Sequence, residues 1–296
     1  MLEILPSGET LGATVKGADL SQALSDEDFG TILRALGRYG VLRFPAQSLT
    51  PAAQKAFAAR FGSLEVNVAG MYQDAEHPEI MFLSNIVQNG RPIGLADAGQ
   101  DWHTDMSYSA TIALANVLFA IKVPRDAAGR ALGATRFANM HAAYDDLPQA
   151  LKDRLADATA VHDFNKFWEM MRAKGSSRPA LTEEQRRKKP PVSHMVFLTH
   201  PISGAKVFYA NPGYTVRIEG MPQSESDETL SFLFAHQLQP QYLYEHSWSE
   251  GDLMMWDNIG TLHTAIADYG PQQPRLMQRC QVMADRIFAQ PLAGAA

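Results

Sequence analysis

Short apolar segments with the length and composition of β-strands dominate this sequence. The longest, 112-IALANVLFAI-121, is far below the roughly 20 residues that a membrane-crossing helix needs. Many short strands with a few helices favour a mainly β fold with flanking helices (α+β), built on a sandwich or barrel. The other segments of this kind are 41-VLRF-44, 80-IMFLS-84, 134-ATRFANM-140, 195-MVFLTH-200, 207-VFYAN-211, 252-DLMMW-256 and 275-RLMQRCQVM-283.

Three helices are predicted from their start signals. Ser25 with Asp28 resembles a capping box before a helix at about 26–38. Thr50-Pro51 opens a second helix, with proline at its first position. We expect a third helix over 225–236, capped by Ser224 with Asp227.

Residues 163–191 differ from their surroundings, because they contain Gly-Ser-Ser, a basic run and a final Pro-Pro. We interpret them as a partly helical excursion from a single domain over 1–296. Such an insertion is either a lid over a site or a solvated surface loop.

Composition limits the function classes. The chain has 296 residues, 46% of them apolar, and a net charge of -6, so a nucleic-acid-binding or membrane-surface protein is not expected. Cys280 is the single cysteine, so no internal disulfide can form, and a reducing compartment fits. The N-terminal segment has no signal-peptide pattern. We therefore expect a cytoplasmic protein, and a homo-oligomer (dimer or tetramer).

A His-x-Asp pair carries the main chemical signal. In 101-DWHTDMSYS-109, His103 and Asp105 would share one face of a strand. The best third partner among nine histidines is His263, in 256-WDNIGTLHTAIADYG-270. Two His and one carboxylate form the ligand set of a non-haem Fe(II) site that leaves coordination positions open. The alternative is a hydrogen-bonded His–Asp pair in a polar core.

Two arginines on the last strand-like segment support a ligand site. Period-2 alternation places Arg275 and Arg279 on one face, about 13 Å apart along the strand. If that face is buried, both cations need anions, because a buried unpaired charge is costly. A carboxylate beside a metal would satisfy them through the bidentate arginine fork.

With these residues the sequence resembles the Fe(II)/2-oxoglutarate-dependent dioxygenases that include taurine dioxygenase and chlorophenoxyacetate dioxygenase. The resemblance covers nearly the whole chain. It implies a double-stranded β-helix (jelly roll) with flanking helices, and the substrates 2-oxoglutarate and O2 at an Fe(II) centre. Its other markers are GATVKGADL, VLRFPAQ, FGSLE, GATRFANM, VHDF and LTHPISGAKVFYANPGYTVRIEGM.

The resemblance also implies roles for individual residues. His103, Asp105 and His263 match the Fe(II) ligands. Thr135 and Arg275 match the residues that bind the distal carboxylate of 2-oxoglutarate, and the retained Asp105 favours hydroxylation over halogenation.

Other matches concern the substrate. Arg279 matches an arginine near the metal that contacts the substrate anion, the proximal carboxylate of 2-oxoglutarate, or both. Met106, Phe164 and Tyr214 match substrate-pocket positions, for which plain core packing is the alternative. Where taurine dioxygenase has histidines after Phe-Gly-Glu-Leu, this chain has Asn67 in 61-FGSLEVNVAG-70.

The expected reaction is hydroxylation of a small anionic sulfonate or carboxylate, with an apolar body preferred over taurine, and with fragmentation where the hydroxylated carbon carries a leaving group. Two alternatives remain open: another metal-dependent enzyme on a cupin-like barrel, and a ligand-binding protein without catalysis.

Overall fold

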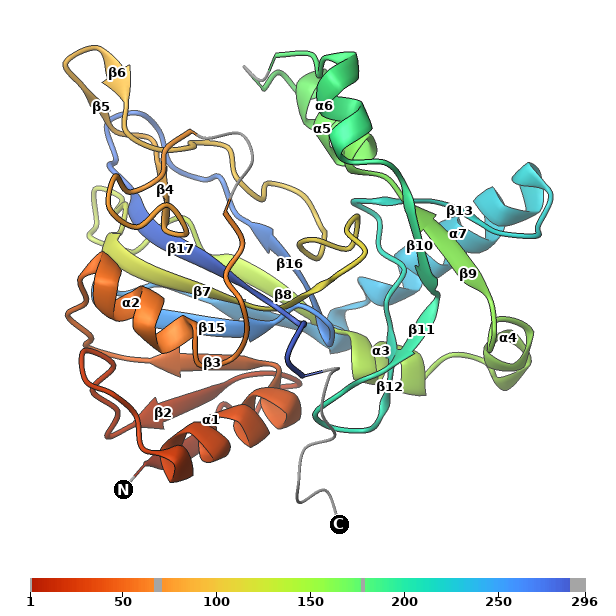
Figure 1. Cartoon of the computed structure of the whole chain (residues 1–296), viewed down its shortest axis with the longest axis horizontal. Coiled ribbons are helices and arrows are strands. Elements are labelled where there is room, and N and C mark those ends of the chain that lie inside the picture. Colours follow the sequence, from red (N-terminus) through yellow and green to blue (C-terminus); the bar gives the residue numbers. More distant parts are fainter. Residues whose placement is uncertain (1, 67–70, 177–178, 288–296) are drawn as a thin grey trace.

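The computed structural model describes residues 2–66, 71–176 and 179–287. Its largest unit, within these residues, is a seven-stranded sheet in the order β1-β2-β3-β15-β7-β17-β4 (Figure 1). Its pairings are antiparallel except that of β2 with β3. The strands are β1 (Glu3–Pro6), β2 (Ala13–Lys16), β3 (Val41–Phe44), β15 (Leu253–Asp257), β7 (Ala113–Lys122), β17 (Leu276–Met283) and β4 (Met81–Ser84).

The long apolar segment forms the centre of this sheet. β7 pairs with β15 on one side and β17 on the other, and its first eight residues are buried. A strand covered on both faces needs a continuous apolar run rather than an alternating one, which explains the sequence of β7.

A smaller sheet lies against the large one and carries part of the site. Its order is β14 (Leu243–His246), β8 (Thr135–Asn139) and β16 (Thr261–Ala265). The chain passes from β15 in the large sheet to β16 in the small one through a turn at 258–260. A buried cluster that includes Phe137, Trp256 and Met277 fills the space between the two sheets.

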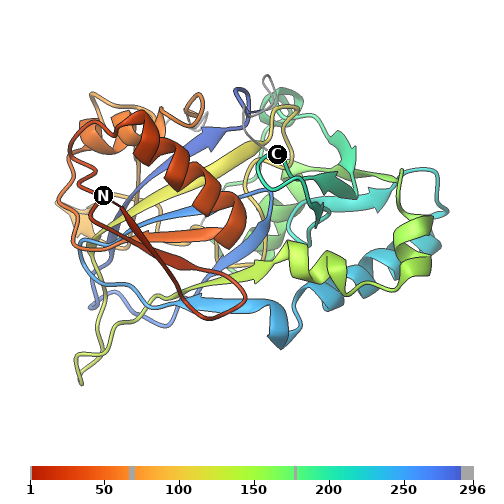
Figure 2. The same ribbon diagram turned by 90° about the horizontal axis from the view of Figure 1, so that it is seen from below.

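Two helices near the N-terminus pack on the large sheet, the first against β2, β3 and β15 and the second against β17 (Figure 2). The Ser25 hydroxyl accepts a hydrogen bond from the N–H of Asp28 at the start of α1 (Asp26–Tyr39), which confirms that predicted cap. Thr50 caps α2 (Pro51–Ala58) in the same way. Both helices bury one apolar face, as an amphipathic surface helix does.

A second group of elements lies beside the two sheets in Figure 1. The helix predicted at 225–236 is α7, but its predicted cap is wrong, because Pro222 occupies the N-cap position and Ser224 lies inside the helix. The group comprises α3 (Met140–Asp145), α4 (Gln149–Arg154), β9 (Thr159–His162), β10 (Val192–Met195), β11 (Phe197–Thr199), β12 (Lys206–Phe208), β13 (Thr215–Ile218), α7 (Gln223–Gln237) and the 3-10 helix η1 (Pro240–Tyr242).

The excursion at 163–191 leaves from the end of β9 and returns through β10, which pairs with β9. It contains α5 (Phe164–Ala173) and the exposed α6 (Glu183–Lys188), which project together at the top of Figure 1. A short hairpin, β5 (Val87–Gln88) with β6 (Arg91–Pro92), projects on the other side. In the described part of the chain, every helix is too short or too polar to cross a membrane.

Candidate metal centre

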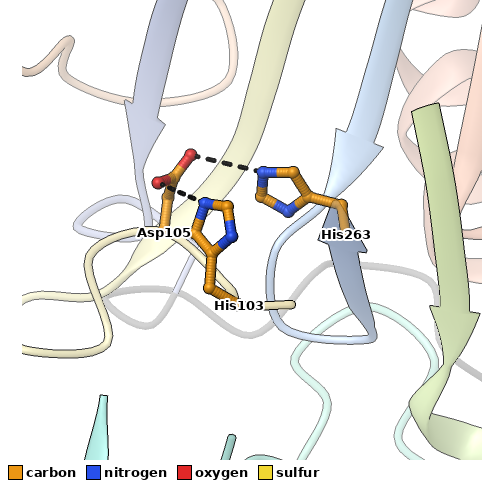
Figure 3. A group of neighbouring side chains, drawn as sticks. All are labelled: His103, Asp105 and His263. Carbon is orange, nitrogen blue, oxygen red and sulfur yellow. Dashed lines mark ion pairs between the residues drawn. The ribbon is translucent and has the colours of Figure 1, made fainter. Parts of the chain in front are cut away.

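His103, Asp105 and His263 lie together at the edge of the small sheet (Figure 3). His103 and His263 face each other across an isolated β-bridge, in which each backbone N–H donates to the carbonyl of the other. The Nε2 atom of His103 is 3.5 Å from Oδ1 of Asp105, and that of His263 is 3.8 Å from Oδ2. The three side chains thus direct their ligand atoms at one point.

Asp105 reaches this point through a turn and not along a strand. The expectation of a shared strand face for His103 and Asp105 is wrong, because the bridge at His103 is followed at once by a turn over 105–108. Met106 has a φ of +60°, and its carbonyl accepts from the N–H of Ser109. A non-glycine residue in this left-handed region costs about 1–3 kcal/mol and often marks a functional site.

The protonation states suit a divalent cation. Nδ1 of His103 lies 2.7 Å from the carbonyl oxygen of Asp101, which can only accept, so the proton is on Nδ1 and the lone pair is on Nε2. Burial lowers the pKa of His263 to about 3. Burial opposes ionisation of Asp105, but its polar and cationic neighbours, Arg279 among them, hold its pKa well below the usual value. The site therefore presents two imidazole Nε2 atoms and one carboxylate.

Close packing fixes the His103 ring. The ring lies 4.8 Å from that of Phe167, centroid to centroid. A Cβ atom added to Gly213 would lie 2.6 Å from Cβ of His103, so only glycine permits this approach. The His263 ring packs against Trp256 at 5.0 Å. Both imidazoles are thus oriented by their neighbours.

Arg275 and Thr135 are both buried, with 6% and 3% of their surface exposed. The Nε atom of Arg275 has no hydrogen-bond partner among the described residues, and no carboxylate in that part of the chain forms an ion pair with it. Tyr269 is its neighbour, with the ring centroid 5.9 Å from the guanidinium carbon. Burial lowers the pKa of Arg275. A buried cation in this situation requires an anionic ligand.

Thr135 follows a glycine that lies close to Arg275. A Cβ atom added to Gly133, two residues earlier, would lie 3.4 Å from Nε of Arg275. The indole N–H of Trp248 donates to Oγ1 of Thr135 at 3.0 Å, so the threonine hydroxyl can use its own hydrogen toward a carboxylate.

Arg279 lies between the metal centre and a cavity. Its Nη1 atom is 3.6 Å from Oδ2 of Asp105, and its side chain borders a cavity of about 510 Å³. Met277 packs in the cluster between the sheets, whereas Cys280 and Val282 pack in the other core cluster. This placement agrees with the predicted alternation along β17.

Aromatic side chains form one wall of the cavity. The predicted pocket residues Met106, Phe164 and Tyr214 all border it. The sequence did not single out Tyr108 and Phe167, whose rings lie 4.7 Å and 5.2 Å from that of Tyr214. A ring-rich wall is a suitable surface for an apolar ligand body. The candidate Asn67 lies outside the described residues.

His141, His200 and Asp257 form another His/His/Asp group in the described part of the chain. Nδ1 of His200 accepts from two backbone N–H groups, so its proton is on Nε2, which lies 2.9 Å from Oδ2 of Asp257. Asp257 also accepts from two N–H groups of the following turn. With the nitrogen already protonated, this group is a structural support for the turn before β16.

Comparison with known proteins shows the family. Residues 3–281 match the family described as taurine catabolism dioxygenase TauD, TfdA family. Pentalenolactone F synthase of Streptomyces avermitilis is 32% identical over 94% of this chain and 92% of its own. The 2,4-dichlorophenoxyacetate dioxygenase of Cupriavidus pinatubonensis, described as alpha-ketoglutarate-dependent, is 30% identical over 95% and 98%.

Solved structures agree. The structure of AAD-2 in complex with Mn(II) and N-oxalylglycine matches with a TM-score of 0.79 and 28% identity, over 96% of this chain and 97% of that one. A taurine dioxygenase from Burkholderia xenovorans matches with a TM-score of 0.76 and 26% identity, over 95% and 89%. The chain therefore belongs to the TauD/TfdA family and is an Fe(II)- and 2-oxoglutarate-dependent dioxygenase.

Proposed function

We propose that this enzyme hydroxylates a small organic anion with an apolar body, and that His103, Asp105 and His263 are its three Fe(II) ligands. One observation carries the assignment: two imidazoles and a carboxylate converge, with ligand atoms within 4.8 Å of one another, beside a cavity of about 510 Å³. A neutral nitrogen pair and one carboxylate are the donors that non-haem Fe(II) prefers. We also propose that the two facing sheets are the halves of a double-stranded β-helix.

Arg275 and Thr135 are proposed to bind the distal carboxylate of 2-oxoglutarate. The support is the buried guanidinium without a carboxylate partner in the described residues, and a buried hydroxyl that can donate, two residues after the glycine that lies near this guanidinium. The arginine fork and the threonine hydroxyl would together satisfy both oxygens of one carboxylate. Burial of these groups keeps water from competing for the same hydrogen bonds.

The bound iron supplies the chemistry, namely oxidative decarboxylation of 2-oxoglutarate by O2 coupled to hydroxylation of the substrate. The protein supplies position and charge. Asp105 remains ionised because of its low pKa, and His103 keeps a lone pair on Nε2 because Asp101 holds the Nδ1 proton. If the hydroxylated carbon carries an ether oxygen or the sulfur of a sulfonate, the product fragments to a carbonyl compound and a leaving group.

The substrate class follows from the lining of the cavity. Arg279 places a cation beside the metal centre, and Lys189 places another over the Tyr108 ring, within 3.8 Å of Glu65. Both side chains are mostly buried, with 17% and 19% exposed. The wall of Tyr108, Phe164 and Tyr214 borders the same cavity. This arrangement fits a carboxylate or sulfonate attached to an aromatic or cyclic body.

The excursion at 163–191 is proposed to act as a lid within a single domain over 1–296. Phe164 and Phe167 at the start of α5 and Lys189 after α6 border the cavity. The Nζ atom of Lys189 lies 3.8 Å from Oε1 of Glu65, which also borders the cavity. Residues of the insertion therefore form part of the substrate site itself.

Succinate formation tests the proposed function. Purified protein with Fe(II), ascorbate, O2 and 2-oxoglutarate would be given aryloxyalkanoates, cyclic carboxylates, aryl and alkyl sulfonates, sulfate esters and taurine. We expect succinate release to rise most with an anion that carries an apolar body. Taurine as the best substrate would contradict the proposed substrate class, and no 2-oxoglutarate turnover with any of them would contradict the proposed function.

A further inference from the structure

Asn116 is a buried polar residue in the middle of the otherwise apolar β7. It is 0% exposed and pairs in register with Trp256 of β15 and Gln281 of β17. An amide at the centre of a sheet is costly unless its hydrogen bonds are made. The buried amide of Asn116 therefore requires hydrogen-bond acceptors close by.

The side-chain amide of Asn116 donates to the carboxylate of Asp105. Its Nδ2 atom lies 2.6 Å from Oδ2 of Asp105 and 3.2 Å from Oδ1 of Asn258. The two amide hydrogens are thus directed at two acceptors. The reverse amide orientation would place an oxygen against an ionised carboxylate, so the network itself assigns the nitrogen to this side.

Asn258 links the same network to the strand of His263. Its carbonyl accepts from the hydroxyl of Thr104, which lies between His103 and Asp105, and its N–H donates to the carbonyl of Leu114 on β7. Asn258 begins the turn that leads into β16. The Asn116 amide therefore connects three segments, which are β7, the His-x-Asp turn and the turn before His263.

We propose that Asn116 is a positioning residue that fixes the rotation of the Asp105 carboxylate, so that Oδ1 is the oxygen available to the metal. This inference rests on the proposed role of Asp105 as a ligand. Oδ2 accepts a short hydrogen bond from Asn116 and lies 3.6 Å from Nη1 of Arg279 and 3.8 Å from Nε2 of His263, whereas Oδ1 lies 3.5 Å from Nε2 of His103. A carboxylate that presents one oxygen occupies one coordination position and leaves more of the metal open to its other ligands. Outer residues of this type change metal affinity by about 10- to 100-fold when they are removed.

The experiment uses Asn116→Leu, which keeps the side-chain volume and removes the donor, and Asn116→Ser, which keeps a shorter donor. The matched control is Gln54→Leu. Gln54 is also a 0% exposed amide, and it donates to the carbonyls of Val117 and Gln278 rather than to the metal centre. The whole protein, freed of metal, is titrated with Co(II), and both the dissociation constant and the visible spectrum of the bound ion are recorded. Thermal unfolding of each metal-free variant reports the structural effect separately.

We expect Asn116→Leu to weaken Co(II) binding by about 10- to 100-fold and to change the visible spectrum, which reports the number and geometry of the ligands. Asn116→Ser should fall between Asn116→Leu and wild type, while Gln54→Leu should lower the unfolding temperature and leave the spectrum unchanged. Wild-type affinity and spectrum in both Asn116 variants would overturn the inference, as would equal losses in Gln54→Leu. Wild-type protein that binds no Co(II) would instead overturn the metal site.

Discussion

Truncation of Arg275 to alanine should weaken the binding of 2-oxoglutarate strongly, and should change metal affinity and unfolding temperature little. Only 6% of the Arg275 surface is exposed, so its charge is screened little by water. Removing one partner of a buried, hydrogen-bonded charge pair costs about 2–5 kcal/mol. At 1.4 kcal/mol for each factor of ten, the dissociation constant for 2-oxoglutarate should rise about 30-fold to several-thousand-fold.

The structure favours the upper part of this range. The variant would leave the distal carboxylate of 2-oxoglutarate in a buried site with Thr135 as its remaining proposed donor. Arg275→Lys should fall between wild type and Arg275→Ala, because lysine restores the charge but lacks the planar two-donor fork. The matched control is Arg136→Ala on the same strand as Thr135. Arg136 forms an exposed pair with Glu245, which contributes at most about 1 kcal/mol to stability.

The assay is 2-oxoglutarate binding by isothermal titration under anaerobic conditions, with metal-loaded protein, followed by the KM for 2-oxoglutarate in succinate formation. A specific loss should appear in both values, while metal affinity and unfolding temperature change little. Unchanged affinity for 2-oxoglutarate in Arg275→Ala would refute the reasoning that the buried guanidinium, which has no carboxylate partner among the described residues, binds this carboxylate.

Three further outcomes are expected from other parts of the structure. Gly213→Ala should lower metal affinity, because the new Cβ would lie 2.6 Å from Cβ of His103 and must displace it. The control is Gly30→Ala in α1, where the new Cβ meets only a flexible arginine side chain. This control should stabilise the protein by up to about 1 kcal/mol. Arg279→Gln should reduce the preference for an acid over its neutral amide, measured as the ratio of kcat/KM values, and a wild-type enzyme that turns over both equally would remove Arg279 as the anion anchor. Burial, and then the charge of neighbouring His194, lowers the pKa of His162 to about 3. The unfolded chain therefore binds a proton below pH 6.5 that the folded one does not, and His162 should remove about 2 kcal/mol of stability between pH 7 and pH 5. Urea unfolding at both values should show a smaller pH effect in His162→Gln, and equal pH effects would contradict the neutral buried state.

Sequence patterns predicted the regular elements where one physical signal dominated. The caps at Ser25 and Thr50 marked two helices correctly, since a hydroxyl that accepts from the first free N–H groups is a local feature. The central strand was visible as an apolar run because it is covered on both faces. The helix after Pro222 was predicted with the wrong N-cap, because Pro222 and Ser224 are both residue types that commonly lie at the start of a helix.

Other elements depend on contacts that are distant in sequence. Residues 195–200 read as one strand, but β10 ends at Met195 and β11 begins at Phe197, and the two pair in different sheets. β9 and β13 were not predicted, because neither has a turn signal or an alternation long enough to stand out. Pairing partners, not local propensity, decide the limits of such short strands.

The candidate site was predicted by residue type better than by geometry. His103, Asp105 and His263 were chosen from spacing and resemblance, and the structure brings them together. The sequence did not reveal the left-handed backbone conformation of Met106, next to the Asp105 carboxylate, because backbone strain leaves no pattern in residue type. Asn116 lay unnoticed within an apolar run, although a lone amide in a buried strand is itself a signal.

Anaerobic Fe(II) titration of the metal-free chain tests the central claim most directly. Equilibrium dialysis of wild type, His103→Ala, Asp105→Ala and His263→Ala would give the number of Fe(II) ions bound per chain, with circular dichroism to verify that each variant is folded. We predict one Fe(II) per wild-type chain and a folded protein without stoichiometric Fe(II) in each variant. One Fe(II) per chain in all three folded variants would contradict the assignment of the metal centre to these residues.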